Sequence, residues 1–442
     1  MKKRLTILGA GESGTGAALL GKAKGYNVFV SDMGQIKAQY VQELEANGIE
    51  FESGTHSEAR ILESDLVIKS PGIPDSAPLI KRLRAKGNLI IGEIEFAAKY
   101  TASKLIGITG TNGKTTTTLL TYHLLKEGGL NVGLGGNVGK SFARQVIEDQ
   151  HDWYVLELSS FQLDDCYDLR LNIAVLLNIT PDHLDRYDYD FEKYIASKMH
   201  IFQLVHLGSH AIYWNDDQQI GKNISKAARG LKVHPFSLRG DASEINNDRL
   251  FFTPRSLEVS APRADISIKG LHNMLNAQAA GYAASLAGVS EEAIINGFKS
   301  FENAPHRLES VRELNGINYI NDSKATNIDS VYYALDAVDT PIVWIAGGID
   351  KGNDYSLIQA LVQKKVKGLI CLGKDNTKLI KAFRTVVPHV EETDDLIQAL
   401  KMAKEMSVSG DTILLSPACS SFDLFKNYED RGDKFRQAVL AI

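Results

Sequence analysis

The chain has 442 residues, of which 44% are apolar and 23% are charged, and its formal net charge is −5. This composition is typical of a soluble globular protein, and the length predicts two to four domains. The mildly acidic balance argues against a nucleic-acid or membrane partner, since such partners usually require a strongly basic face.

The first block of the chain has the pattern of a parallel α/β domain. Apolar runs at Leu5–Leu8, Val28–Val30 and Leu66–Ile68 predict strands, and helical patterns lie between them. Such alternation predicts right-handed crossovers, with ligand-binding loops at the carboxyl ends of the strands. The loop Gly9-Ala-Gly-Glu-Ser-Gly14, with Asp32 about twenty residues later, fits a dinucleotide-binding fingerprint. Taken alone, this motif favours NAD, although an isolated fingerprint of this kind is weak evidence.

The second block contains the most informative stretch. A strand at Leu105–Thr109 runs into Gly110-Thr-Asn-Gly-Lys-Thr-Thr116, and a helical pattern follows over Thr117–Lys126. Glycines let backbone N–H groups converge on a phosphate, and the start of the helix adds a positive dipole. The Lys114 side chain would neutralise phosphate oxygens, and the Thr115 hydroxyl would bind Mg²⁺. The alternative is an ordinary strand-to-helix turn with an exposed lysine, but the strand–loop–helix context favours nucleotide binding.

Two polar residues lie at the ends of the next strands of this block. Further strands are expected at Tyr154–Leu158, Ile173–Leu177 and Ala211–Trp214, and residues 236–270 are expected to form a small antiparallel appendage. Glu157 lies inside the first of these apolar runs, where a carboxylate is costly unless it meets a charge such as Mg²⁺. His183 lies just beyond the second. Either residue alone is more often structural, but beside a phosphate loop both become candidate metal ligands.

The third block begins after Pro305-His306-Arg307. Its predicted strands are Ile342–Ile345, Leu369–Leu372 and Thr412–Leu415, each followed by glycine or serine. The chain therefore divides into predicted domains at residues 1–95, 96–304 and 305–442. We expect a Rossmann-like N-terminal domain, a P-loop-type central ATPase domain and a Rossmann-like C-terminal domain, all of the α/β class.

The sequence also indicates where the protein resides. The basic start Met1-Lys2-Lys3-Arg4 is followed by an apolar run too short for a secretion signal or a membrane span. The three cysteines, Cys166, Cys371 and Cys419, are odd in number and far apart, which fits reduced thiols. We expect a cytoplasmic protein.

Several motifs together resemble a known family, the Mur ligases, a superfamily that also includes the folylpolyglutamate synthases. The motifs occur in the family's order: Gly110-Thr-Asn-Gly-Lys-Thr-Thr116, Glu157, Asn178-Ile-Thr-Pro-Asp-His-Leu-Asp185, Lys198, Gly270-Leu-His-Asn-Met-Leu-Asn276, His306-Arg307 and Asp322-Ser-Lys324. The match spans essentially the whole chain. Three segments resemble the member that adds D-glutamate: Leu158-Ser-Ser-Phe-Gln-Leu163, Asp322-Ser-Lys-Ala-Thr-Asn327 and Ser416-Pro-Ala-Cys-Ser-Ser-Phe-Asp423. The Asp-Asn-Pro-Arg segment of ligases that add the third residue is missing from the sequence.

The resemblance implies roles for individual residues. The residues implied to bind ATP are Gly110, Thr111, Asn112, Gly113, Lys114, Thr115, Thr116, Asn273, Asn276, Arg307 and Asp322. The implied metal ligands are Thr115, Glu157, His183 and a carbamylated Lys198, and the implied catalytic residues are Lys114, Glu157, His183, Lys198 and Lys324. The implied contacts of the UDP-sugar are Ser13, Gly14, Asp32, Gly72, Asn137 and Gln162, while Thr326, Lys351, Ser416 and the backbone of Phe422 would hold D-glutamate. At the position after Asp32 the family often has a hydroxyl residue, but this chain has Met33, which puts the uracil contacts in doubt.

The implied reaction is the ATP-dependent addition of D-glutamate to UDP-N-acetylmuramoyl-L-alanine through an acyl phosphate, in peptidoglycan precursor synthesis. The implied cofactors are ATP and two magnesium ions, the substrates are small molecules, and we expect a monomer. His183 is a hypothetical acceptor of the amine's proton. Domain closure would bring the substrates into line.

Other interpretations remain open from the residues alone. Lys198 could be a solvated helix lysine, Lys351 a solvated turn lysine and Ser416 a helix cap. The function could be that of another Mur-type ligase, with a different amino acid, or of an NAD-linked oxidoreductase built on the N-terminal fingerprint. The oxidoreductase interpretation leaves the loop at 105–116 unexplained. A regulatory protein that binds nucleotide without catalysis is a further alternative, which Glu157, His183 and Lys198 argue against.

Overall fold

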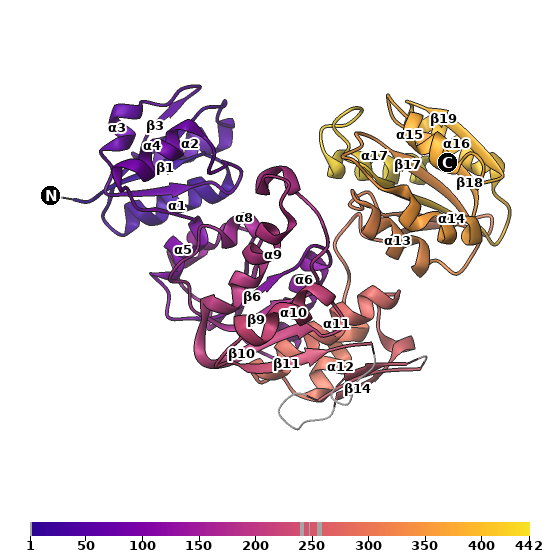
Figure 1. Ribbon diagram of the computed structural model, residues 1–442, viewed down its shortest axis with the longest axis horizontal. Helices are drawn as coiled ribbons and strands as arrows, with labels where there is room; N and C mark the ends of the chain where they lie inside the picture. The colour runs from indigo at the N-terminus through magenta and orange to yellow at the C-terminus, as the bar shows by residue number, and fades with distance from the viewer. Residues whose placement is uncertain (1, 239–242, 247, 254–258) are drawn as a thin grey trace. The chain divides into compact units, whose positions relative to one another are not determined.

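A computed structural model describes residues 2–238, 243–246, 248–253 and 259–442 (Figure 1). By packing, the chain separates into two units. One comprises Met1–Ser267 and Leu275–Phe301, and the other comprises Ile268–Met274 and Glu302–Ile442. The predicted α/β class with parallel sheets is confirmed, while the domain boundaries at 95/96 and 304/305 stay predictions.

The first sheet is parallel, with the strand order β3-β2-β1-β4-β5. Its strands are β1 (Arg4–Leu8), β2 (Asn27–Asp32), β3 (Glu50–Ser53), β4 (Leu66–Lys69) and β5 (Ile90–Ile91). The helices around it are α1 (Glu12–Ala23), α2 (Ala38–Ala46), α3 (Glu58–Leu62) and α4 (Pro78–Lys86). Alternate side chains of β1 enter two different hydrophobic clusters, Leu5 and Ile7 one and Leu8 the other, so helices cover both faces of the sheet.

The second sheet has six parallel strands in the order β11-β10-β9-β6-β8-β7. They are β6 (Lys104–Thr109), β7 (Val132–Gly136), β8 (Trp153–Glu157), β9 (Leu171–Leu176), β10 (Val205–Trp214) and β11 (Lys232–Phe236). Because β6 lies between β8 and β9, the loops after these three strands are neighbours at one edge of the sheet. The sequence places the phosphate loop after β6, Glu157 at the end of β8 and His183 after β9.

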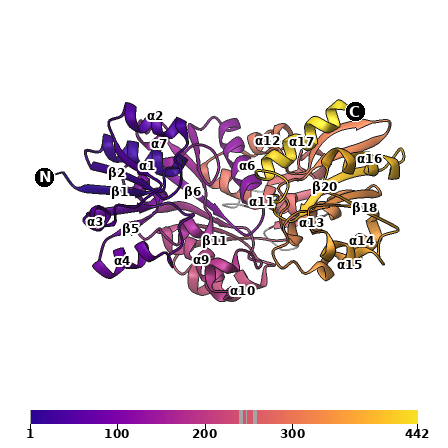
Figure 2. The ribbon, with the colours of Figure 1, turned by 90° about the horizontal axis from the view of Figure 1, so that it is seen from above.

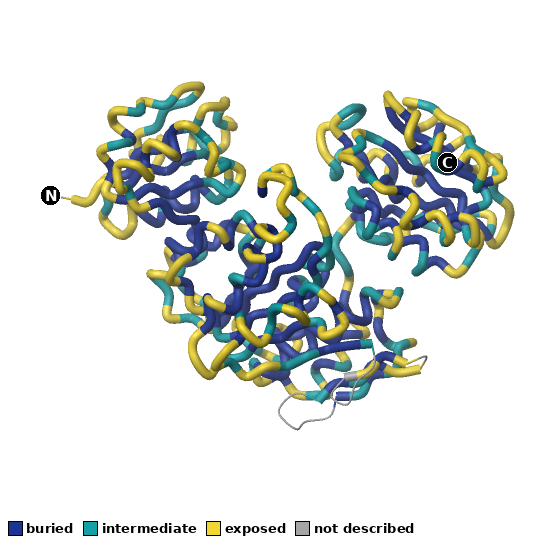
Figure 3. Tube along the Cα trace, viewed as in Figure 1, coloured by how far each residue is buried: buried dark blue, intermediate teal, exposed yellow. Residues whose placement is uncertain are grey.

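Helices surround this sheet and continue the chain beyond it. They are α5 (Glu93–Ala98), α6 (Lys114–Glu127), α7 (Phe142–Val146), α8 (Ser160–Leu163), α9 (Phe191–Met199), α10 (Gln218–Ala227), α11 (Leu271–Ala287) and α12 (Glu291–Ser300), with short 3₁₀ helices η1 (Leu184–Tyr187), η2 (His200–Leu204) and η4 (Arg263–Asp265). Figure 3 shows the strands buried and the outer loops exposed.

The predicted antiparallel appendage is confirmed for the residues that the structure describes. It comprises β12 (Ser243–Ile245), β13 (Arg249–Phe252) and β14 (Val259–Pro262), paired in that order. The rest of the predicted segment at 239–242, 247 and 254–258 lies outside the described residues.

The third sheet has the order β15-β16-β20-β17-β18-β19, in which only the β15–β16 pair is antiparallel. Its strands are β15 (Glu309–Leu314), β16 (Ile317–Asn321), β17 (Ile342–Gly347), β18 (Val366–Leu372), β19 (His389–Thr393) and β20 (Thr412–Ala418). Helices α13 (Ile328–Ala337), α14 (Gln359–Lys365) and α15 (Thr377–Phe383), with η5 (Tyr355–Ile358), cover one face, and α16 (Leu396–Met406) and α17 (Tyr428–Ala441) cover the other (Figure 2).

Two global expectations can be compared with this architecture. All three cysteines are free, as predicted, and all three are buried. In the described part of the chain, no helix combines the length and apolar character needed to cross a membrane.

Candidate active site

The phosphate loop has the strand–loop–helix form that the sequence predicts. It joins β6 to α6, and two of its glycines have backbone angles that disfavour other residues, with φ of 158° at Gly110 and 82° at Gly113. A Cβ atom added to Gly113 would lie 2.4 Å from Oδ1 of Asn276, so a larger residue would have to displace that side chain as well as adopt the left-handed backbone. The Lys114 Nζ donates to the carbonyls of Gly110 and Thr111, at 2.9 and 2.8 Å.

Side chains from the loop after β9 hold the phosphate loop in place. Asn178 accepts a hydrogen bond from the Asn112 N–H at 2.8 Å and donates to the Asn112 carbonyl at 3.1 Å. The Thr111 hydroxyl donates to the Thr180 carbonyl and accepts from the Thr180 N–H, both at 3.0 Å. These paired bonds fix the loop's backbone relative to the neighbouring strand.

Glu157 is buried at the end of β8, with 1% of its surface exposed. Its Oε1 accepts a hydrogen bond from Asn137 Nδ2 at 2.9 Å, while its Oε2 has no hydrogen-bond partner. A buried carboxylate oxygen without a donor is costly unless a cation compensates it. The predicted sugar-binding Asn137 and the predicted metal ligand Glu157 therefore touch each other.

Lys198, in the last turn of α9, is 1% exposed, so the solvated-lysine alternative is wrong. Its Nζ donates to the Gly110 carbonyl at 2.8 Å, the same oxygen that accepts from Lys114. Burial lowers the pKa of Lys198 well below its ordinary value, and the charge of Lys114 lowers it further. The uncharged amine is therefore easier to reach here than on a lysine in solvent.

His183 lies on the loop between β9 and η1, in a left-handed conformation with φ of 51°. Its side chain is about half exposed, its Nε2 lies 3.6 Å from Asp182 Oδ2, and its ring packs edge-on against Phe161. This exposure leaves the imidazole accessible from solvent, unlike Glu157 and Lys198.

The glycine-rich loop of the first block is organised by Asp32. The two oxygens of this carboxylate accept hydrogen bonds from the N–H groups of Ala10, at 2.6 Å, and Gly34, at 2.8 Å. Gly14 lies so close to the Gly9 carbonyl that an added Cβ would be 1.9 Å from its oxygen. Met33 is 62% exposed beside Asp32.

The predicted sugar-nucleotide residues Ser13 and Gln162 line one small cavity together with Lys69, Pro71, Gly92, Glu93, Ile94 and Asp165. The Gln162 Oε1 accepts hydrogen bonds from the backbone and hydroxyl of Ser159, at 2.9 and 3.0 Å, in a capping box of α8. The Gly72 carbonyl accepts from Arg186 at 2.9 Å. The structure therefore brings Ser13 and Gln162 together across the first and second sheets.

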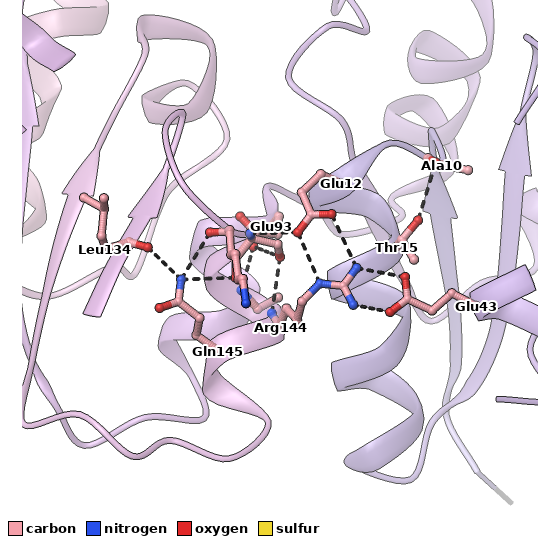
Figure 4. Close-up of polar contacts among 11 residues, drawn as sticks. Ala10, Glu12, Thr15, Glu43, Glu93, Leu134, Arg144 and Gln145 are labelled. Atoms are coloured by element: carbon pink, nitrogen blue, oxygen red, sulfur yellow. Dashed lines mark hydrogen bonds and ion pairs between the residues drawn. The ribbon is translucent and has the colours of Figure 1, made fainter. Parts of the chain in front are cut away.

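The contact between α1 and α7 is polar (Figure 4). Arg144 forms ion pairs with Glu12, at 3.1 Å, and with Glu43. Buried nearby, the Oε1 of Glu93 accepts from the Ser141 hydroxyl at 2.7 Å and from the Ala143 N–H at 2.6 Å. Burial raises the pKa of Glu93 to about 7 in spite of these two donors.

Asp322 and Ser416 are hydrogen-bonded to each other in the other unit. The buried Ser416 hydroxyl donates to Asp322 Oδ2 at 2.9 Å, and the Leu308 N–H donates to Oδ1 at 3.2 Å. Burial raises the pKa of Asp322 to about 7, against the effect of these hydrogen bonds. Ser416 lies within β20, so the helix-cap alternative is wrong.

The remaining predicted residues of this unit differ in exposure. The Lys324 Nζ lies 3.5 Å above the centre of the Tyr428 ring, a cation–π contact. Phe422 is 69% exposed, and Lys351, in the loop after β17, is also exposed. Asn273 donates to the Lys269 carbonyl at 2.8 Å. Thr326, which follows β16, is half-buried. Arg307 lies close enough to Asp322 for its charge to oppose the rise in the pKa of that carboxyl.

Sequence reasoning missed several residues that organise these loops. Lys69 and Asp165 form a buried ion pair at 2.8 Å, Arg186 binds the loop after β4, and Arg431 is buried with hydrogen bonds to Ser323 and to backbone carbonyls. A lysine inside an apolar strand was a signal for Lys69, because such a charge requires a partner. Nothing in the sequence showed which partner it would have.

The geometry at the edge of the second sheet suits phosphate chemistry. The phosphate loop carries the backbone N–H groups at the start of α6 and the Lys114 ammonium. The neighbouring strand β8 ends at the buried Glu157, one of whose carboxylate oxygens lacks a donor. In the described ranges, no three His, Cys, Asp or Glu side chains cluster as a metal site would require. A metal at this edge would therefore draw its other ligands from hydroxyl, water, substrate or modified groups.

Comparison with known families gives matches over most of the chain. Residues 4–78 match the MurD N-terminal domain, residues 108–284 the Mur ligase middle domain, and residues 306–419 the Mur ligase glutamate ligase domain. Among curated proteins, the chain is 49% identical over 449 residues to the UDP-N-acetylmuramoylalanine–D-glutamate ligase of Cytophaga hutchinsonii, covering 100% of both chains. It is 48% identical to the protein of the same name from Porphyromonas gingivalis W83, covering 100% of this chain and 99% of that one.

Solved structures share the fold at low sequence identity. A pseudomurein peptide ligase type C from Methanothermus fervidus matches with a TM-score of 0.63 at 18% identity, covering 100% of both chains. The MurF ligase from Thermotoga maritima, solved in complex with ADP, matches with a TM-score of 0.63 at 16% identity, covering 94% of this chain and 95% of that one.

Proposed function

This chain belongs to the Mur ligase family, and we propose that it joins D-glutamate to UDP-N-acetylmuramoyl-L-alanine at the expense of ATP. Relatives that carry this activity in their names are 39–49% identical over essentially the full chain, which supports the proposal. The structural observation that carries it is the phosphate loop at Gly110–Thr116, flanked by the buried Glu157 and Lys198. The product would enter peptidoglycan precursor synthesis. We propose that the protein acts in the cytoplasm and as a monomer.

The proposed chemistry has two steps. The terminal carboxylate of the L-alanyl group attacks the γ-phosphorus of ATP, the bond to the bridging oxygen breaks, and ADP leaves. The D-glutamate amine then attacks the carbonyl carbon of the acyl phosphate, inorganic phosphate leaves, and the amine loses a proton. Because the first step brings two anions together, stabilisation of negative charge should supply most of the catalysis.

The phosphate loop is the natural site for the triphosphate. Residues 110–116 would bind it through backbone N–H groups and the Lys114 side chain. The Lys114 Nζ donates to two carbonyls of this loop, and on nucleotide binding it would donate to phosphate oxygens in their place. In the other unit, the residues proposed to contact the nucleotide are Asn273, Arg307, Asp322 and Lys324. Asn276, which lies beside Gly113, is proposed to contact it as well.

The residues at this edge fit magnesium. Mg²⁺ prefers oxygen ligands and keeps several waters, and Glu157 offers a buried carboxylate oxygen that lacks a hydrogen-bond donor. Thr115 and Glu157 would hold one ion and His183 a second, and the ions would neutralise charge on the phosphates. His183 remains a hypothesis as the acceptor of the amine's proton.

Lys198 has the properties that carbamylation requires. Only an uncharged amine attacks carbon dioxide, and burial beside Lys114 favours the uncharged form. Attack on the carbon of CO₂ with loss of one proton yields a carbamate, which replaces a cation by a carboxylate-like anion. We propose this anion as a further metal ligand.

The sugar nucleotide is proposed to bind along the first two sheets. Ser13 and Gly14 at the start of α1 would face the diphosphate, where the helix dipole favours an anion, and Asp32 would lie near the uracil. Gly72, Asn137 and Gln162 would contact the sugar part. The contact between Asn137 and Glu157 would join this site to the catalytic edge.

The D-glutamate site is proposed for the carboxyl edge of the third sheet. Lys351 offers an exposed cation, and Phe422 is exposed. Thr326 lies four residues after Asp322 in the sequence. Ser416 is buried with its hydroxyl donated to Asp322, so it would have to exchange that bond to hold a carboxylate. Lys351 is therefore the strongest candidate of the four.

A phosphate-release assay tests the function. The purified chain is incubated with ATP, Mg²⁺, UDP-N-acetylmuramoyl-L-alanine and a panel of D- and L-amino acids. We expect phosphate release with D-glutamate and with no other amino acid of the panel. Release only with another amino acid would assign the chain to a different branch of the family, and no release with any of them would refute the ligase proposal.

A further inference from the structure

The loop after β4, Ser70–Ile73, is held by two cations from different parts of the chain. The Lys69 Nζ donates to the Ile73 carbonyl at 3.0 Å. Arg186, in η1 after the second sheet, donates to the carbonyls of Pro71, at 3.1 Å, Gly72, at 2.9 Å, and Ile73, at 3.4 Å. Both cations therefore converge on the Ile73 carbonyl.

Lys69 is not available to bind a ligand as a simple surface cation. It is 3% exposed, its Nζ lies 2.8 Å from Asp165 Oδ2, and Asp165 is 1% exposed. A second carboxylate, that of Asp75, lies 3.5 Å away and is 55% exposed. A cation removed from water so completely requires a matched anion, and Asp165 supplies it.

The pair links the first and second sheets at the proposed sugar-nucleotide site. Lys69 ends β4 of the first sheet, whereas Asp165 follows α8 at the edge of the second. Both line the cavity that also contains Ser13 and Gln162. The Asp165 carbonyl in addition accepts the Gly92 N–H at 2.9 Å, which ties the start of α5 to the same point.

We infer that Lys69, neutralised by Asp165, is a positioning residue of the sugar-nucleotide site, where it fixes the Ser70–Ile73 loop against the second sheet opposite Arg186. This inference rests on the proposed function, because it takes the UDP-linked sugar as the ligand of that loop. A loop held in its binding conformation loses less entropy when the ligand binds, so the benefit should appear in affinity for that ligand. It should leave ATP binding, which uses the phosphate loop, unchanged.

The test measures binding of UDP-N-acetylmuramoyl-L-alanine and of a non-hydrolysable ATP analogue by calorimetry on the full chain. The main variant is Lys69→Met combined with Asp165→Leu, which removes both charges and leaves neither one buried alone. We expect its Kd for the sugar nucleotide to rise at least about tenfold. Its Kd for the ATP analogue should stay within about twofold of wild type, and its kcat at saturation within about threefold, because the reacting groups are not touched.

Three further variants make the result decisive. Asp165→Asn keeps the shape of the side chain and should shift the Kd for the sugar nucleotide in the same direction by a smaller factor, so the positioning role can still be tested if the double variant does not fold. Arg186→Gln should act in the same direction from the other side of the loop. Lys367→Met combined with Asp411→Leu is the matched control, since Lys367 pairs with the buried Asp411 at 2.7 Å in the other unit. It should leave both dissociation constants unchanged.

The two proposals fail in different ways. A wild-type chain that neither binds the sugar nucleotide nor releases phosphate would overturn the proposed function. A wild-type chain that does both, while the double variant and Asp165→Asn bind the sugar nucleotide within about twofold of it, would overturn the positioning role of Lys69. A Kd for the ATP analogue that rises equally would do so too, since it would indicate a general structural role.

Discussion

Glu93, the first residue of α5, offers a quantitative test of the electrostatics where α5 packs against α7. The side chain is 5% exposed, its Oε1 accepts from Ser141 and Ala143, and its Oε2 has no hydrogen-bond partner (Figure 4). Burial raises its pKa from 4.5 to about 7. We predict that Glu93→Gln, which has the shape and neutrality of the protonated acid, stabilises the protein at neutral and alkaline pH relative to wild type.

The sign and size of the effect follow from linkage. In the unfolded chain Glu93 ionises near its ordinary pKa, whereas in the folded chain it ionises only near pH 7, so the folded state binds the proton more tightly. Its contribution to stability is therefore complete below the unfolded pKa and is lost as the pH rises through the folded pKa. A shift from 4.5 to about 7 corresponds to about 3 kcal/mol in total, of which about 2 kcal/mol falls between about pH 5.5 and about pH 8.

The assay is urea unfolding of both proteins at those two pH values. The free energy of unfolding of wild type minus that of Glu93→Gln should fall by about 2 kcal/mol between the acidic and the alkaline condition. Other titrating groups, such as Asp322 in the other unit, contribute equally to both proteins and cancel in the difference. A difference that does not change with pH would refute the reasoning, because it would mean that Glu93 ionises alike in both states.

Three predictions concern catalysis. Lys114→Ala should lower kcat by about 10²–10³-fold, which is the scale for losing a preorganised charge. Lys126→Ala, on the same helix, should leave kcat unchanged. A turnover near that of wild type in Lys114→Ala would exclude the phosphate-loop assignment. Lys198→Ala should be nearly inactive, and added short-chain carboxylates should partly restore its activity. Lys193 is exposed on the same helix, so Lys193→Ala should be active without them. Kinetics with and without bicarbonate tests for the carbamate. Lys351→Ala should raise KM for D-glutamate at least about tenfold and leave KM for ATP and the UDP-sugar within about twofold. If all three constants rise together, the amino-acid site must be sought elsewhere.

The sequence predicted the central strands of each sheet because their apolar runs are continuous. Strands Leu105–Thr109 and Thr412–Leu415 are buried on both faces, and both appear within one to three residues of their predicted ends. Peripheral strands were missed for a physical reason. β3, Glu50–Ser53, is only partly buried, and β5, Ile90–Ile91, has two residues, so neither carries an apolar run long enough to be recognised.

Within the candidate site, local sequence predicted the loop but not the contacts that arrange it. The glycines and Lys114 could be identified directly, because their spacing follows the chemistry of phosphate binding. Asn178, which fixes the phosphate loop through two hydrogen bonds, is 66 residues away from Asn112. Lys69 and Asp165 lie farther apart still in the sequence, one at the end of β4 and the other just after α8. Partners of this kind follow from topology, which a single sequence does not specify.

The arrangement around Gly110 explains why the half-buried Lys114 and the buried Lys198 should differ in charge. The Nζ atoms of Lys114 and Lys198 both donate to the Gly110 carbonyl, at 2.9 and 2.8 Å, so two ammonium groups would repel each other in a site largely removed from water. Lys114 lies at the helix start, where a phosphate can neutralise it, whereas Lys198 is fully enclosed. The repulsion is relieved if Lys198 gives up its proton. The repulsion becomes an attraction if Lys198 acquires the negative charge of a carbamate, because an anion would then lie beside Lys114 and would be available to the second metal ion proposed beside His183. Electrostatics therefore disfavours the ammonium form of Lys198, and that form is also the one that the proposed modification removes.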